Sequence, residues 1–137
     1  MALMPRRTKY RSSHRGKLKG NETRGNKVSF GEFGLQSLGT AWLTGVQIEA
    51  ARISINRYLK RKGKVWIRVY PVKPVSKRPP ETRMGKGKGN PEFWVCPIRP
   101  GRVIFEVQGA GAGDVREAFR RAASKLPVRV RMIAREG

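Results

Sequence analysis

The sequence has little of what enzymes and secreted proteins need. It contains one cysteine, Cys96, and one histidine, His14, among 137 residues. A single cysteine excludes an internal disulfide and fits a reducing compartment. One cysteine and one histidine also cannot supply the four ligands of a structural zinc site. The nine acidic residues are scattered, with no pair spaced for metal binding or acid–base work. We therefore expect no enzymatic activity, no cofactor and no bound metal.

Long apolar runs are also missing. No stretch approaches the ~18 consecutive apolar residues of a transmembrane helix. The N-terminal Met1–Met4 run is followed by basic residues, not by the apolar stretch of a signal peptide. We therefore expect a cytoplasmic protein with no membrane partner.

Positive charge is the dominant feature of the chain. Its 31 Lys and Arg residues against 9 Asp and Glu give a formal net charge of +22. Self-repulsion at that level opposes compaction, so a polyanion is the natural counter-charge. Nucleic acid is the leading candidate, because clustered Lys and Arg in a strongly basic domain are its electrostatic footprint. An anionic membrane surface is the rival.

The first basic segment covers residues 1–27. It holds nine Lys and Arg residues, a single acid and almost no aliphatic side chain after Met4. Such a segment cannot bury enough surface to fold alone, so we predict an extended N-terminal tail that becomes ordered on its partner. Its candidate RNA-binding residues are Arg6, Arg7, Lys9, Tyr10, Arg11, His14, Arg15, Lys17 and Lys19.

The second basic segment is a predicted loop over residues 71–91, inside a single domain spanning 28–137. It has five prolines, three glycines, six Lys and Arg residues and one acid. Glycine lets the backbone approach a phosphate closely, and each Lys supplies a mobile point charge. A solvated flexible loop is the alternative. The candidate RNA-binding residues are Lys77, Arg78, Arg83, Met84, Gly85, Lys86, Gly87 and Lys88.

Neither glycine-rich stretch matches a nucleotide-binding motif. The loop lacks the Gly-Lys-Ser/Thr ending of a P-loop. Gly109–Gly113 lies between a predicted strand and a predicted helix, but its spacing is GxGxG instead of GxGxxG. We interpret it as a helix N-cap turn, with a phosphate contact at the helix N-terminus as the alternative.

Hydrophobic periodicity predicts the element order β-α-β-loop-β-β-α-β. A capping box at Thr44–Gln47 opens a helix that runs to about Lys62, and a similar pattern at Asp114–Glu117 opens one that ends at Pro127. Strands are predicted over 28–38 (one or two short ones), 64–70, 93–98, 102–108 and 128–135, with a Pro-Gly hairpin turn at 99–101. The fold class is α+β, a two-layer sandwich with two helices packed on a mostly antiparallel sheet.

Several aromatic residues could stack on bases. For those within strand patterns, packing in the core is the preferred interpretation, whereas Tyr10 lies in the tail between two cations. The residues concerned are Tyr10, Phe30, Phe33, Trp42, Trp66 and Trp94.

Several segments along nearly the whole chain share the sequence of a known family. They are Pro5–Arg11, Ser29–Gly31, Gln47–Arg52, Lys64–Val69, Arg83–Gly89, Pro100–Val103, Ala118–Phe119 and Lys125–Pro127. The heptapeptide Arg83–Gly89 is the most specific of them. Together these segments resemble the family of bacterial large-subunit ribosomal protein sixteen.

The resemblance implies a structural constituent of the large ribosomal subunit that binds its ribosomal RNA. It implies that the tail and the loop lie near transfer RNA at the aminoacyl site, with the peptidyl site as a second option, close to the peptidyl transferase centre. Arg83, Lys86 and Lys88 would then be the loop residues nearest that RNA. It also implies neighbouring ribosomal proteins as partners, and a two-layer α+β fold.

Two other function classes remain open. A DNA-compacting protein would bind duplexes as a symmetric dimer, but the sequence offers no dimer-forming helix and no base-reading recognition helix. We therefore do not expect a homo-oligomer. A nuclease or phosphoryl-transfer enzyme would need metal-dependent turnover, for which the chain has no candidate residues.

Overall fold

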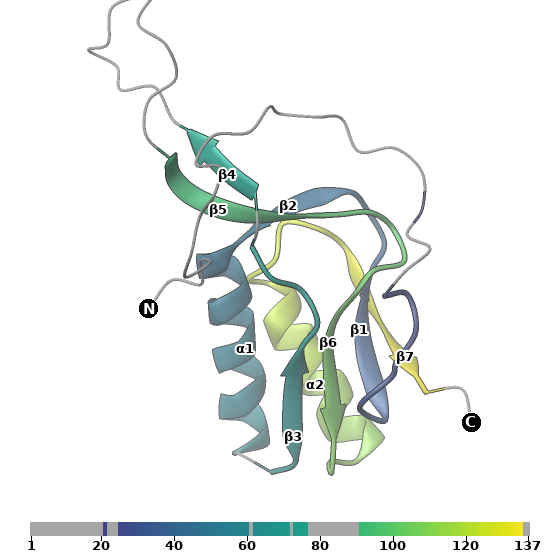
Figure 1. The fold of residues 1–137 in the computed structure, drawn as a ribbon. Coiled ribbons are helices and arrows are strands. Elements are labelled where there is room, and N and C mark those ends of the chain that lie inside the picture. Colours follow the sequence, from purple (N-terminus) through teal and green to yellow (C-terminus); the bar gives the residue numbers. More distant parts are fainter. Residues whose placement is uncertain (1–20, 22–24, 61, 72, 77–90, 136–137) are drawn as a thin grey trace, which may run out of the picture.

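The computed structural model describes residues 21, 25–60, 62–71, 73–76 and 91–135, and Figure 1 shows how its elements are arranged. In chain order they are β1 (Phe33–Ser37), β2 (Ala41–Thr44), α1 (Gly45–Leu59), β3 (Lys64–Ile67), β4 (Lys73–Ser76), β5 (Pro91–Ile98), β6 (Val103–Gln108), α2 (Ala112–Ala123) and β7 (Val130–Ala134). Two helices packed with antiparallel strands confirm the predicted α+β class.

The strands divide between two antiparallel sheets and do not form one. The large sheet has the order β3-β6-β1-β7, and the small sheet has the order β2-β5-β4. In the large sheet Leu35 of β1 lies opposite Phe105 of β6 on one side and Met132 of β7 on the other. Figure 1 shows the small sheet lying across one end of the helices and the large sheet.

The predicted hairpin between residues 93–98 and 102–108 is wrong. β5 pairs with β2 and β4, whereas β6 pairs with β1 and β3. The turn itself forms, since the N–H of Arg102 donates to the carbonyl of Arg99 at 3.2 Å. However, the N–H of Gly101 donates to the carbonyl of Ser37 at 2.8 Å. This hydrogen bond holds the turn at the end of β1, so that β6 continues into the large sheet.

The helix α1 begins as predicted. The Thr44 hydroxyl accepts the N–H of Gln47 at 3.1 Å, and the Gln47 side chain accepts the N–H of Thr44 at 3.0 Å. This reciprocal pair confirms the capping box. The helix ends at Leu59, before the predicted Lys62, because Lys60 already adopts the left-handed conformation with φ of 51°.

The second predicted capping box is wrong. The N-cap of α2 is Gly111, and no side chain caps the first turn. Glu117 forms ion pairs with Arg120 and Arg121, in the turn that follows, and does not reach back to the helix start. The Gly109–Gly113 stretch does serve as the predicted N-cap turn.

The predicted loop over residues 71–91 begins and ends in strands. β4 takes up residues 73–76, and β5 already begins at Pro91. β4 is the edge strand of the small sheet and has β5 as its neighbour on one side. The missing N–H of Pro74 therefore breaks no hydrogen bond to a strand on the other side. Residues 77–90, the centre of the predicted loop, lie outside the described residues.

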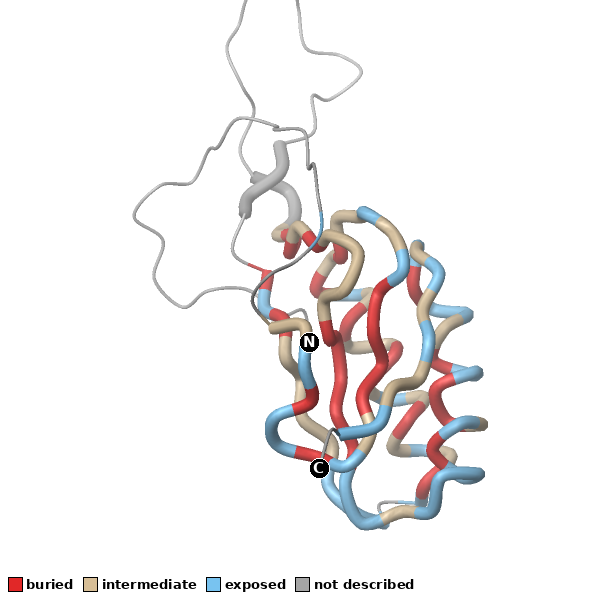
Figure 2. Tube along the Cα trace, turned by 90° about the vertical axis from the view of Figure 1, so that its right-hand side faces the viewer, coloured by how far each residue is buried: buried red, intermediate tan, exposed pale blue. Residues whose placement is uncertain are grey.

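The core lies between the two helices and one face of the large sheet. The helices contribute side chains at helical spacing, and β1 and β6 contribute Leu35, Phe105 and Val107. Figure 2 shows this buried layer in red. The helical residues are Ile48, Ala51, Ile55 and Leu59 of α1 and Val115, Ala118, Phe119 and Ala122 of α2.

Neither helix in the described part of the chain is long and apolar enough to cross a membrane. Ile53, which falls outside the apolar stripe of α1, is 42% exposed and does not contribute to the core.

Candidate nucleic-acid interface

The predicted RNA-binding residues lie outside the described residues. This holds for all nine tail candidates, from Arg6 to Lys19, and for all eight loop candidates, from Lys77 to Lys88. What the structure gives is the place where each segment joins the folded body.

The loop has both ends fixed at one place. Ser76 and Pro91 are opposite each other in the β4–β5 ladder, next to a register shift. β5 is itself held by β2, where Leu43 lies opposite Cys96, and both of these residues are buried. The basic loop therefore starts and finishes at the same end of a short antiparallel ladder.

The tail joins the body along the large sheet. The segment of residues 25–31 runs beside β1, as the purple ribbon of Figure 1 shows. The carbonyl of Gly25 accepts the N–H of Val103 at 2.8 Å, and the carbonyl of Asn26 accepts the Gln36 side chain at 3.3 Å. Residues 25 and 26, which fall within the predicted tail of residues 1–27, thus contact the body through their carbonyls.

A buried carboxylate holds this segment on the sheet. Glu106 of β6 points to the face opposite the helices, and its side chain is fully buried. One of its oxygens accepts three consecutive backbone N–H groups, from Ser29, Phe30 and Gly31, at 2.7 to 2.9 Å. The other oxygen accepts a hydrogen bond from the Arg68 guanidinium. Residues 29–31 thus form a turn that one side chain fixes.

The same contacts set the charge state of this carboxyl. Burial alone would raise the pKa of Glu106. The N–H of Gly31, the Arg68 guanidinium and the N–H of Phe30 together outweigh burial, and the pKa of Glu106 lies below its ordinary value. Glu106 is therefore an ionised structural anchor at neutral pH and is unsuited to proton transfer.

Phe30, at the centre of this turn, is directed outward and is 55% exposed. Its ring stacks on that of Trp66, with centroids 6.1 Å apart and planes inclined by 24°. Arg68 lies 5.0 Å from the Phe30 ring centroid, and the ammonium of Lys64 lies 5.1 Å from that of Trp66. We call these four residues the aromatic–cation cluster.

The preferred interpretation of Phe30 as a core residue was wrong, and Trp66 is only partly buried. The alternation of residues 64–70 indicates that Lys64, Trp66 and Arg68 share one face of the strand. Val65 and Ile67 lie on the opposite face. The exposure of Phe30 has no such signal, because it lies in an irregular segment.

The helical side of the body carries arginines that are already paired with acids. Glu117 forms exposed ion pairs with Arg120 at 2.6 Å and with Arg121 at 3.3 Å. Hydrogen bonds from Arg120 first, and then from Arg121, lower the pKa of Glu117 to about 2. Arg121 also lies 4.6 Å from the Tyr58 ring centroid. Exposed pairs of this kind contribute little to stability.

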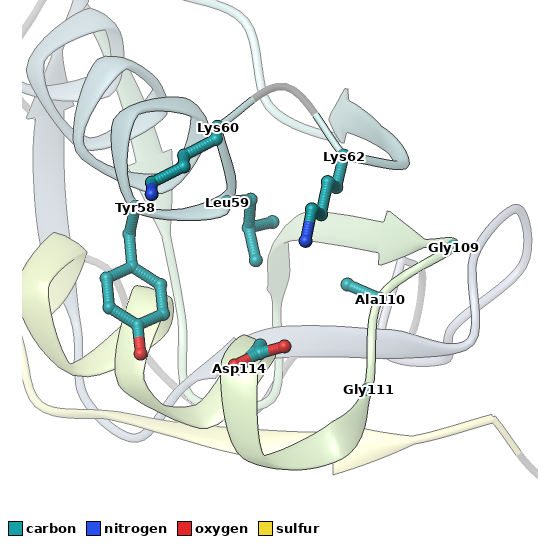
Figure 3. A pocket seen from close by; sticks show the side chains of 8 residues that line it. All are labelled: Tyr58, Leu59, Lys60, Lys62, Gly109, Ala110, Gly111 and Asp114. Atoms are coloured by element: carbon teal, nitrogen blue, oxygen red, sulfur yellow. The ribbon is translucent and has the colours of Figure 1, made fainter.

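A pocket lies between the end of α1 and the start of α2. Figure 3 shows Lys60 and Lys62 on the α1 side and Asp114 across from them, in the first turn of α2. The alternative of a phosphate contact at this helix N-terminus gains little support, because Asp114 places a carboxylate at the same opening.

The described residues offer no metal centre, since no three His, Cys, Asp or Glu side chains gather among them. Cys96 lies in β5, and its thiol is buried.

Comparison with known proteins gives a consistent result. A family model described as ribosomal protein L16p/L10e matches residues 5–133. The chain is 57% identical over 136 residues to a protein of Methylacidiphilum infernorum named large ribosomal subunit protein uL16, covering 99% of this chain and 95% of that protein.

Proposed function

The chain belongs to the ribosomal protein L16p/L10e family, and from this premise we propose that its tail and loop bind large-subunit ribosomal RNA and help to organise the aminoacyl-site transfer-RNA region. The family consists of structural ribosomal proteins and not of enzymes. The chain is a constituent of the large ribosomal subunit and acts in translation in the cytoplasm, among ribosomal RNA and neighbouring ribosomal proteins.

The distribution of charge is the observation that carries the RNA-binding proposal. Residues 1–27 and 71–91 together hold 13 of the 22 net positive charges, in little more than a third of the chain. The acids of the body offset few of these charges, because Glu106 and Glu117 are already engaged by arginines of the body. Lys and Arg that neutralise phosphates release condensed counterions, which drives binding of RNA.

The two segments have different tasks in this proposal. The tail, with Arg6, Arg7, Lys9, Tyr10, Arg11, His14, Arg15, Lys17 and Lys19, anchors the protein on ribosomal RNA. The loop, with Lys77, Arg78, Arg83, Met84, Gly85, Lys86, Gly87 and Lys88, contacts RNA near the aminoacyl-site transfer RNA. The paired loop ends at Ser76 and Pro91 support the second task, because a fixed origin limits where the loop can reach.

The loop can be tested in large subunits reconstituted with the full chain. We predict that Arg83→Ala and Lys86→Ala each weaken aminoacyl-site transfer-RNA binding by about tenfold, the effect of losing one charged hydrogen bond. The melting temperature of the free protein should not change, because the segment that holds both residues lacks the apolar pattern of a packed element.

The matched control is Arg116→Ala, which removes an exposed cation from α2. It should leave transfer-RNA binding intact. Normal transfer-RNA binding by both loop variants, at equal melting temperature, would remove the loop from the mechanism.

A further inference from the structure

The exposure of Phe30 is not a by-product of a loose segment. Three backbone N–H groups at residues 29–31 donate to one oxygen of Glu106, so the backbone on which this ring stands is fixed. Gly31 lies so close to β6 that an added Cβ would stand 2.7 Å from the carbonyl oxygen of Val107. A large apolar ring is thus displayed to solvent from a rigid base.

The surroundings of the ring are suited to a flat, negatively charged partner. Trp66 stacks beneath Phe30 and leaves much of that ring open. Two cations lie over the rings, Arg68 over that of Phe30 and Lys64 over that of Trp66. Arg68 also pairs with the buried Glu106, whereas Lys64 is exposed at the surface.

Other charges near the cluster are mixed but do not reverse its sign. Lys27 is exposed, and its carbonyl lies 3.5 Å from an Arg68 nitrogen. Glu32 is an exposed acid at the other end of the same segment. The buried Glu106 is satisfied internally, so the accessible balance around the two rings remains positive.

We propose that the aromatic–cation cluster is a stacking site for one unpaired base of large-subunit ribosomal RNA, with the Phe30 ring as the platform and Lys64 on the adjoining phosphate. Unpaired bases in RNA stack on aromatic side chains, and a neighbouring cation completes the contact through the backbone. The proposal rests on the proposed function, since it assigns a second RNA contact to the same protein. It differs from the tail and loop contacts because the folded body itself supplies it.

An apolar side chain of a neighbouring protein is the competing occupant of this surface. The cations favour RNA over that occupant, because an apolar partner would gain nothing from Lys64 and would desolvate it.

The test measures binding of the full chain to a large-subunit ribosomal RNA transcript at fixed salt. We expect Phe30→Leu to weaken binding by about 5- to 150-fold, the range that one base–aromatic stack supplies. Phe30→Tyr keeps the ring and should bind like the wild type. Val46→Ala, which trims another exposed apolar residue on α1, is the control and should not change the affinity.

Two further readouts complete the test. The melting temperatures of all three variants should match the wild type, because Phe30 and Val46 lie outside the core cluster. A photoreactive phenylalanine analogue at position 30 should crosslink to ribosomal RNA in assembled subunits.

Unchanged affinity of Phe30→Leu, or crosslinking to a neighbouring protein instead of RNA, would overturn the stacking site while leaving the proposed function standing. Failure of the wild-type chain to bind the transcript would instead overturn the proposed function.

Discussion

Glu106 is an acid in a strongly basic chain, and the outer face of the large sheet is organised around it. It connects β6 to the segment of residues 29–31 and to Arg68 of the chain that follows β3. Its partners in that segment are 75 to 77 residues away in sequence. Sequence patterns report local periodicity, so they could not predict this role.

We predict that Glu106→Gln lowers the free energy of unfolding by about 3 kcal/mol. This is the low end of the range for breaking a buried ion pair, because Arg68 keeps some access to water. Urea unfolding at pH 7 measures the change. Glu117→Gln, which breaks exposed pairs, is the control and should alter stability little. Equal effects of the two substitutions would contradict the anchoring role of Glu106.

The pH dependence of this effect has a definite sign. The pKa of Glu106 is lowered in the folded protein, so its ionised form contributes stability above the unfolded value and loses it as the pH falls through the folded one. The advantage of the wild type over Glu106→Gln should therefore be constant from pH 7 to 5 and shrink below about pH 4.3. Urea titrations along that series measure it, and an advantage that grew in acid would refute the assignment.

At the scale of elements, features encoded within a few neighbouring residues were predicted correctly. The pairing of segments that are distant in sequence was not. The capping box of α1 lies within four residues and was confirmed. The turn at residues 99–101 was also correct, but its capture by Ser37 decided which sheet β6 joined. A Pro-Gly turn specifies a reversal of the chain and not the partner of the strand that follows.

Substitution of Gly63 and of Gly113 by alanine should change the stability of the protein in opposite directions. Gly63, in the turn between α1 and β3, has φ of 77°, and an added Cβ would stand 2.1 Å from the carbonyl oxygen of Gln108. Gly63→Ala should therefore destabilise the protein by more than about 1 kcal/mol. Gly113 lies in α2 with nothing within 4 Å of an added Cβ, so Gly113→Ala should stabilise by about 0.5 kcal/mol.

Chemical denaturation of the two variants measures both changes. Opposite signs are expected, although the substitution is the same. If both glycines tolerated alanine equally, the close approach of the α1–β3 turn to the end of β6 would not be a constraint on the fold.

At the scale of the whole molecule, a compact body presents basic segments at two places. The tail leaves from the segment that Glu106 holds, and the loop leaves from the β4–β5 ladder. Composition alone locates the positive charge in these two segments. The points of attachment depend on long-range pairing, so only the structure supplies them.

We propose that residues 1–20 of the tail bind the phosphates of RNA and do not contribute to the stability of the fold. The most direct test compares the wild type with a chain lacking residues 1–20, which leaves Gly25 and Asn26 on the body. The measurement is the dissociation constant for a large-subunit ribosomal RNA transcript as a function of salt concentration. The deleted segment has seven Lys and Arg residues, and each phosphate contact contributes about 0.7 to 0.9 to the log–log slope.

We expect a slope that is shallower by up to about 6 in the truncated chain, with an unchanged melting temperature. An unchanged slope would contradict this proposal.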